Sequence, residues 1–241
     1  MDRPQRALGA LDSRHFERVI PDGRLVILPV GALEAHGPHL PLAADQLQAE
    51  ATAEALAART DAWVAPTLPY GVCIGARRFP GTLSVTPETL ARLTEEVLGG
   101  FARLGIRRVL VLSGHAEAVH MAALRAGADR AVSRSPGFRV LVLSDYDFAY
   151  ERRGIDAPDR DGHGGLIETS RVLHLRPELV GPERPIGRRG GSPFAAGPPS
   201  LEEWPESVHG DTTGASAELG SRLQAYILDR LVETIEQHLP A

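Results

Sequence analysis

The sequence contains no lysine among its 241 residues. Catalysis through a lysine Schiff base is therefore excluded, and so is a P-loop, whose lysine holds nucleotide phosphates. The chain also lacks the Gly-x-Ser-x-Gly motif of a nucleophilic serine and a Gly-x-Gly-x-x-Gly dinucleotide-binding motif. Its one cysteine, Cys73, excludes an intramolecular disulfide, lies in no recognisable catalytic motif, and fits a reducing cytoplasm.

Long apolar stretches are absent as well. No segment approaches the roughly 18 consecutive apolar residues that a membrane-spanning helix needs, and no apolar region of a signal peptide follows residues 1–6. The net charge is −5 and basic residues form no long block, so arginine pairs such as Arg188-Arg189 are interpreted as solvated charges. We therefore expect a cytoplasmic protein that binds neither nucleic acid nor membrane.

Short apolar runs alternate with helix-forming segments along the chain. Strands are predicted at 25–30, 62–66, 109–112 and 139–143, and helices at about 45–59, 86–104, 117–132, around Glu168 and at 215–238. This alternation predicts an α/β fold: one single-domain three-layer sandwich over residues 1–241, with a mainly parallel sheet and helices on both faces. The Pro- and Gly-rich stretch 181–210 is expected to be an irregular loop, either a lid, a subunit contact or a disordered segment.

The first polar cluster follows the first predicted strand and consists of Glu34, His36 and Asp45. Glu34 and His36 are two residues apart, so an extended segment projects both to the same side. Asp45 begins the next helix, whose N-terminus favours a carboxylate. Two carboxylates and an imidazole suit Zn²⁺ or Mn²⁺. The alternative is a capping aspartate beside solvent-exposed loop residues.

A second cluster, Ser113-Gly114-His115-Ala116-Glu117, follows the third strand. His115 is expected at the carboxyl end of that strand, where open α/β sheets bind ligands, and Glu117 opens the next helix. One helical turn later, His120 is interpreted as an ordinary histidine on the helix surface, with support of the site as the alternative.

A third cluster spans Asp161 to Ser170, in which a glycine-flexed loop carries His163 and a helix carries Glu168. Acid and imidazole groups near a metal can act as ligand, base or proton donor. Taken alone, this segment also fits a glycine-rich connection with an exposed histidine. The three clusters together favour a metal site.

From about Leu25 to Leu179 the sequence resembles the creatininase family. The motif Pro-Val-Gly-x-x-Glu-x-His-Gly-Pro-His-Leu-Pro-Leu, ending in an Asp, lies between Pro29 and Asp45. Phe79-Pro80-Gly81-Thr82 and the run from His163 to Ser170 resemble two further family motifs. The resemblance implies a creatininase-like fold, a homo-oligomer that is a hexamer, and two divalent metal ions per subunit, zinc or alternatively manganese or iron.

By this resemblance, Glu34, Asp45 and His115 would hold one ion, and His36, Asp45 and Glu168 the other, with Asp45 bridging. A water between the ions would attack a carbonyl or amidine-like carbon, and His163 would pass a proton to the departing nitrogen. The implied function is a metal-dependent amidohydrolase that cleaves a C–N bond of a small amide or cyclic amide.

The chain departs from many family members, which have Asn-Gly-His-Gly-Gly-Asn where this sequence has residues 113–118. Creatininase has His-x-Glu there, as in His115-Ala116-Glu117, so Glu117 is a further candidate ligand or base that competes with Glu168. Tyr146, Phe148 and Tyr150 correspond only loosely to the aromatic residues around creatinine. The family also contains a peptidase and a deformylase that act on biosynthetic intermediates. The alternatives to an amidohydrolase are these two activities, a lyase or cyclase activity, and a non-catalytic scaffold.

Overall fold

The computed structural model describes residues 6–20, 23–192, 194 and 196–240. Four strands form its main sheet: β1 (Val26–Val30), β2 (Trp63–Val64), β3 (Arg108–Ser113) and β4 (Arg139–Ser144). Their order is β2-β1-β3-β4, and every pair is parallel. The expected parallel sheet is confirmed, although β2 is shorter than predicted.

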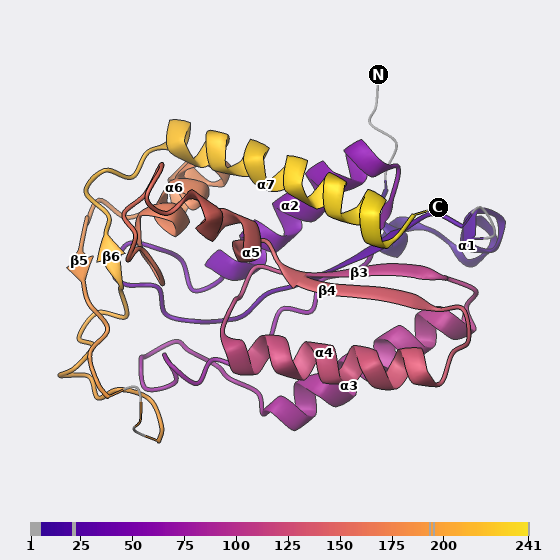
Figure 1. Cartoon of the computed structure of the whole chain (residues 1–241), viewed down its shortest axis with the longest axis horizontal. Helices are drawn as coiled ribbons and strands as arrows, with labels where there is room; N and C mark the ends of the chain where they lie inside the picture. The colour runs from indigo at the N-terminus through magenta and orange to yellow at the C-terminus, as the bar shows by residue number, and fades with distance from the viewer. Residues whose placement is uncertain (1–5, 21–22, 193, 195, 241) are drawn as a thin grey trace.

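Helices cover both faces of this sheet (Figure 1). One face carries α2 (Ala44–Thr60), α5 (Tyr146–Ala149), α6 (Leu166–Leu175) and α7 (Ala217–His238), and the other carries α3 (Pro87–Arg103) and α4 (Ala118–Ser133). Successive strand residues alternate between the two cores: Ile27 packs against the α2 side, and its neighbours Val26 and Leu28 pack against the α3 side. The three-layer sandwich is thereby confirmed.

Local sequence signals set the helix boundaries. Thr86 caps α3, since its hydroxyl accepts a hydrogen bond from the Thr89 amide at 3.1 Å, and Pro87 occupies the first helical position. Ser216 caps α7 in the same way through the Leu219 amide. No helix in the described ranges is long and apolar enough to cross a membrane.

Described residues of the loop 181–210 lie at the end of the sheet where β1 and β3 finish, because Arg189 and Trp204 line the same cleft as Glu34 and His115. The loop contains the short strand β5 (Ile186–Gly187), which pairs antiparallel with β6 (Gly210–Asp211) at the left of Figure 1. Other elements in the described part of the chain include α1 (Ser13–Val19) and the single-turn 3-10 helices η1 (Leu8–Ala10), η3 (Tyr150–Arg152) and η4 (Pro177–Leu179). The loop's described residues therefore lie beside the carboxyl ends of the strands, where the three polar clusters also meet.

Candidate metal centre

Side chains from four segments converge beyond the carboxyl ends of β1 and β3. Glu34 and His36 follow β1, His115 follows β3, Asp45 lies in the first turn of α2, and Glu168 in the first turn of α6. All five are buried, with 5% or less of each residue exposed. Burial of three acids and two imidazoles is costly unless they are paired or bind a metal.

Two glycines allow α2 to approach the sheet closely enough to deliver Asp45. A β-carbon at Gly114, after β3, would lie 2.1 Å from the carbonyl oxygen of Asp45. One at Gly31, after β1, would lie 2.6 Å from Cα of Gln46. Any larger residue at either position would push the start of α2 away from the strands.

Asp45 lies between two imidazole rings. Its Oδ1 is 3.2 Å from Nε2 of His36, and its Oδ2 is 3.1 Å from Nδ1 of His115. On the His115 side, Glu34 Oε2 is 3.1 Å from the same Nδ1. On the His36 side, Glu168 Oε2 is 3.8 Å from Nε2. The two carboxylate oxygens of Asp45 therefore face two separate groups of ligand-type atoms.

Backbone carbonyls orient both imidazoles. His36 donates from Nδ1 to the carbonyl of Glu34 at 3.0 Å, and His115 donates from Nε2 to the carbonyl of Val72 at 3.0 Å. In each ring the other nitrogen then faces Asp45. This is the usual arrangement of a metal-binding histidine, whose second nitrogen donates to an oxygen.

The attraction between these oppositely charged groups has a larger effect on their pKa values than their burial has. Burial favours neutral His36, but Asp45, Glu168 and Glu34 raise its pKa to about 10. The pKa of His115 is likewise raised, by Glu34 and Asp45 acting against burial. Burial opposes the ionisation of Asp45, yet His36 and His115 hold its pKa well below the usual value. An ion that binds here must displace the imidazole protons.

Several ligand atoms lack hydrogen-bond partners within the described residues: Oε2 of Glu34, Nε2 of His36, and both carboxylate oxygens of Asp45. Two groups of these side chains bring their ligand atoms within 4.8 Å of one another, namely Glu34 with His36 and His163, and His36 with Asp45 and Glu168. Buried, unpartnered carboxylate and imidazole atoms are the donor set of Zn²⁺ and Mn²⁺ sites, so the residues fit a metal.

His163 and Glu117, the two other predicted site residues, lie at the edge of this cluster. His163 stacks on His36 with ring centroids 4.2 Å apart, and its Nδ1 is 3.9 Å from Glu34 Oε2. Glu117 accepts hydrogen bonds from the amides of Ile74 and Gly75 at 2.7 and 3.0 Å. Both side chains line the cleft beside the metal cluster, but Glu117 belongs to none of the described candidate groups of ligands.

The interpretation of His120 as a surface histidine is wrong. The residue is completely buried, accepts a hydrogen bond from the Val72 amide at Nδ1, and lies 3.0 Å from the Ser113 hydroxyl through Nε2. Burial, together with the nearby charge of His115, lowers its pKa to about 3, so the ring stays neutral. Ser113 in turn donates to the carbonyl of His115 at 2.7 Å, so His120 helps to position His115 through the Ser113 hydroxyl.

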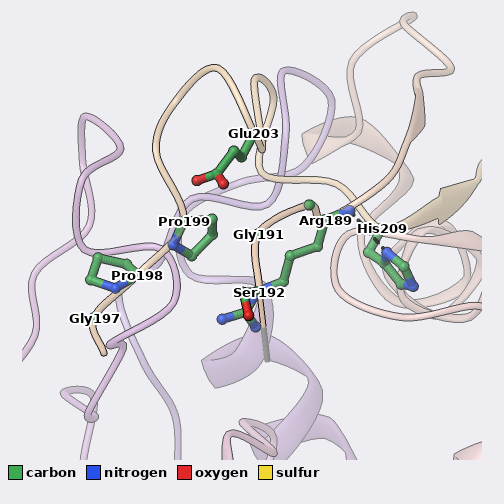
Figure 2. Close-up of a pocket in the computed structure, with 9 residues that line it drawn as sticks. Arg189, Gly191, Ser192, Gly197, Pro198, Pro199, Glu203 and His209 are labelled. Carbon is green, nitrogen blue, oxygen red and sulfur yellow. Dashed lines mark hydrogen bonds between the residues drawn. The ribbon is translucent and has the colours of Figure 1, made fainter. Parts of the chain in front are cut away.

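The open side of the cluster is a cleft of about 160 Å³ whose wall includes residues from the 181–210 loop, Arg189 and Trp204. Arg189 is exposed, as expected for a solvated charge, and it also forms part of the wall of this cleft. Arg189 also borders a larger cavity of about 450 Å³ formed by the same loop, together with Ser192, Glu203 and His209 (Figure 2). Of the three aromatic residues considered from the sequence, only Tyr150 lines the cleft; Tyr146 and Phe148 are buried in the core.

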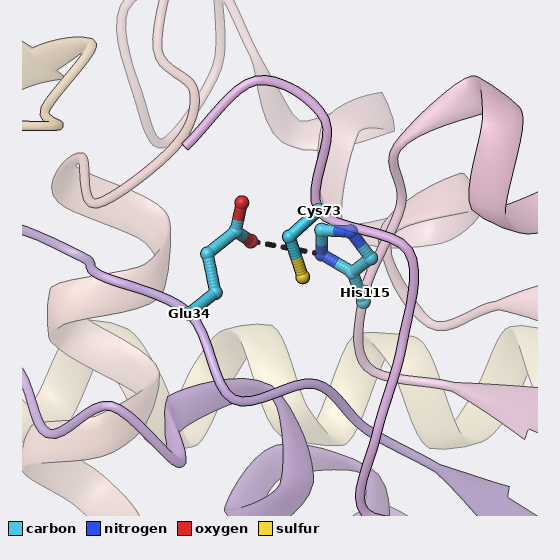
Figure 3. A group of neighbouring side chains, drawn as sticks. All are labelled: Glu34, Cys73 and His115. Carbon is cyan, nitrogen blue, oxygen red and sulfur yellow. Dashed lines mark ion pairs between the residues drawn. The ribbon is translucent and has the colours of Figure 1, made fainter. Parts of the chain in front are cut away.

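Cys73 also lies at the cluster, which the sequence did not predict. Its ligand atom and those of Glu34 and His115 are within 4.8 Å of one another (Figure 3). No motif surrounds Cys73, Arg189 or Trp204, so only the three-dimensional contacts reveal them.

The family model described as "Creatininase: Creatinine amidohydrolase" matches residues 10–235. Among characterised proteins, creatinine amidohydrolase from Pseudomonas putida is 31% identical over 255 residues, which cover 97% of each chain. The mycofactocin precursor peptide peptidase of Mycobacterium tuberculosis is 31% identical over 97% of this chain and 92% of its own. The 3-dehydro-scyllo-inosose hydrolase of Thermotoga maritima is 29% identical over 90% of this chain and 79% of its own. The chain therefore belongs to the creatininase family and is a hydrolase of that family.

Solved structures agree with this assignment. A crystal structure of creatinine amidohydrolase (creatininase) matches with a TM-score of 0.89 and 28% identity, covering 99% of this chain and 100% of that one. Other matching structures are described as manganese creatininase, as a Zn–Zn form of a glutamate-to-glutamine variant, and as that variant complexed with creatine. Creatininase relatives thus bind manganese or zinc, and one binds a small molecule.

Proposed function

We propose that this chain is a binuclear metal amidohydrolase that cleaves a C–N bond of a small amide or cyclic amide. The observation that carries the proposal is Asp45, a buried carboxylate whose two unpartnered oxygens each face a different imidazole at 3.2 and 3.1 Å. A carboxylate in this position is suited to bridge two ions. Two ions, when bound, would supply Lewis acidity that polarises a carbonyl and lowers the pKa of a bound water.

In this proposal Glu34, Asp45 and His115 hold one ion, and His36, Asp45 and Glu168 hold the other. The hydrogen bonds from His36 to the Glu34 carbonyl and from His115 to the Val72 carbonyl support the assignment, because they keep the ligating nitrogens directed at Asp45. Glu168 is preferred over Glu117 as the last ligand, since Glu168 forms a group of ligand atoms with His36 and Asp45, whereas Glu117 belongs to no such group among the described residues.

His163 is proposed to give a proton to the departing nitrogen. Its Nε2 donates to the Ala35 carbonyl at 2.7 Å, which leaves Nδ1 on the side of Glu34 and the cleft. The Ser207 hydroxyl donates to the same carbonyl at 2.9 Å, and His36 and Trp204 contact the ring on its faces and edge. A histidine fixed in this way can exchange a proton with a substrate bound in the cleft.

Arg189 supports a substrate that carries a carboxylate. Its guanidinium lies over the Trp204 ring at 5.1 Å and against Gly75, where a β-carbon would be 3.2 Å from Nη2. Among the residues that the structure describes, no acidic side chain forms an ion pair with it. A planar guanidinium in a cleft matches a carboxylate through two parallel hydrogen bonds. Arg189→Gln should raise KM for amides that carry a carboxylate and leave KM unchanged for their neutral esters; an equal change for both would contradict this role.

The metal assignment is tested with Asp45→Ala, for which Glu88→Ala is the matched control because Glu88 is an exposed acid in the first turn of α3. We expect purified protein to contain two equivalents of zinc, manganese or iron. Asp45→Ala should lose most of the metal and all of the activity, while Glu88→Ala keeps both. Metal content like that of the wild type in Asp45→Ala would refute the bridging role.

Activity is tested with the metal-loaded protein on cyclic amides, formamides and short peptides. Turnover of a small or cyclic amide supports the proposal, and turnover of peptides or formamides alone would point instead to a peptidase or deformylase. The peptidase alternative is supported by the similarity of this chain to the mycobacterial peptidase named above. No turnover at full metal occupancy would favour a scaffold protein. The hexamer implied by the family resemblance stays a prediction.

A further inference from the structure

Cys73 is a buried thiol to which the proposed mechanism gives no role. Its side chain is completely buried, and it is not among the residues that line the cleft. The thiol therefore meets the metal cluster from the protein side, away from bound substrate. It is also the only cysteine in the sequence.

The surroundings of Cys73 are ligand atoms. The sulfur, a carboxylate oxygen of Glu34 and a ring nitrogen of His115 all lie within 4.8 Å of one another. Figure 3 shows the thiol pointing into the space between the Glu34 carboxylate and the His115 ring. Oε2 of Glu34 is buried there without a hydrogen-bond partner among the described residues.

The backbone holds the thiol at a fixed place relative to His115. The Cys73 amide donates to the Ser84 hydroxyl at 2.9 Å. The preceding residue, Val72, accepts a hydrogen bond from His115 through its carbonyl and donates one to His120 through its amide. The same short segment thus orients the His115 ring and positions the sulfur beside it.

Many buried cysteines act only as small apolar side chains. That explanation suits a cysteine surrounded by hydrocarbon, but Cys73 faces a carboxylate and an imidazole, which together with a thiolate form a common zinc ligand set. At the other position, His36, Asp45 and Glu168 offer only nitrogen and oxygen atoms. The two halves of the centre therefore differ in the softness of their ligands.

We propose that Cys73 binds, through its sulfur, the ion held by Glu34 and His115, and that this sulfur makes that position select zinc over manganese. The inference rests on the metal centre of the proposed function. On binding, the S–H bond breaks, the proton leaves to solvent, and a sulfur–metal bond forms without any change of oxidation state. Thiolates favour zinc, whereas carboxylates also suit manganese, so one position is selective and the other accepts either ion.

X-ray absorption on the zinc-loaded wild-type protein tests the proposal without any substitution. A zinc–sulfur distance of about 2.3 Å should accompany the shorter distances to nitrogen and oxygen. The cobalt-loaded protein should show a near-ultraviolet sulfur-to-cobalt charge-transfer band. Protein that binds two ions without either signal would overturn the role of Cys73 and leave the metal centre intact, whereas protein that binds no metal would overturn both proposals.

Cys73→Ser keeps the size of the side chain and removes the sulfur. We expect it to lose both spectroscopic signals, to keep two bound ions, and to lower the preference for zinc over manganese at the Glu34 position by about tenfold or more. Met121→Leu is the matched control, because it removes another buried sulfur and should leave both signals unchanged. Signals that persist in Cys73→Ser would overturn the assignment.

Discussion

A single methyl group at position 114 should disturb both the fold and the metal centre. In Gly114→Ala the new carbon would lie 2.1 Å from the carbonyl oxygen of Asp45 and 3.2 Å from the amide nitrogen of Ala49. Both atoms belong to the backbone of α2, so no side chain can rotate to relieve the overlap. Ordinary contact needs ~3.5 Å, and the start of α2 must therefore move from β3 by about 1.4 Å.

The displacement has two costs of different size. Overpacking a buried position destabilises a protein by ~1–3 kcal/mol, and we expect that loss in the free energy of unfolding of the chelator-treated protein. Metal binding should suffer more, because ligand distances are tolerated only within about 0.2 Å and the movement separates Asp45 from His115. These two side chains are 3.1 Å apart in the wild type.

Urea unfolding and metal analysis after dialysis against a competing chelator measure the two effects. Gly100→Ala is the matched control: its methyl would meet only the Arg103 guanidinium, at 3.7 Å, and alanine within α3 should raise stability by ~0.5–1 kcal/mol. Wild-type stability and metal retention in Gly114→Ala would show that close packing at this glycine does not position Asp45.

The raised pKa values of His36 and His115 predict that zinc added to chelator-treated protein at pH 8 releases protons, which calorimetry in buffers of different ionisation enthalpy detects. The pKa of His36 is about 10 in the folded protein and an ordinary 6.5 in the unfolded chain. Protonated His36 therefore contributes fully to the stability of the metal-free protein below pH 6.5, and this contribution is lost as pH rises through 10. The free energy of unfolding should fall by up to about 1.4 kcal/mol per pH unit in that range. A free energy of unfolding that does not change with pH over this range would contradict the raised pKa of His36. Glu117→Gln should keep two bound ions and lower kcat, because the carboxylate holds the amides of the cleft wall; loss of an ion would instead make Glu117 a ligand.

The positions of the ligand-bearing loops could be predicted because local signals determine them. Short β-branched runs define β1 and β3, and the polar residues directly after them must emerge at the carboxyl edge of a parallel sheet. Asp45 was expected at a helix start and lies in the first turn of α2. The family motif then supplied the pairing of these residues, which spacing alone left open.

The second layer of the site depends on contacts between distant segments and could not be predicted in this way. His120 has the spacing of a helix-surface residue, but the Val72 amide, 48 residues earlier, and the Ser113 hydroxyl enclose it. Arg189 is an exposed residue of a Gly- and Pro-rich loop without periodicity, and only the fold of that loop places it at the wall of the cleft. Composition indicates that such a loop is irregular and carries no information about its contacts.

A buried ion pair connects the elements that deliver Asp45 and Glu168. Asp145, directly after β4, and Arg171, on α6, are both completely buried, with their charged atoms 2.6 Å apart. Arg171 also donates to the Thr52 hydroxyl on α2 at 3.3 Å.

Removal of one partner leaves the other charge in the core. Asp145→Ala should therefore destabilise the protein by ~3–5 kcal/mol in urea unfolding, whereas a second substitution, Arg171→Met, should recover part of this loss because it removes the uncompensated guanidinium. Since α6 also carries Glu168, three residues before Arg171, the single variant should lose metal more readily than the double variant. Strictly additive effects of the two substitutions on stability would mean that the charges do not interact. In that case, close packing at Gly114 and Gly31, rather than this ion pair, would have to hold the helices in the positions that form the metal centre.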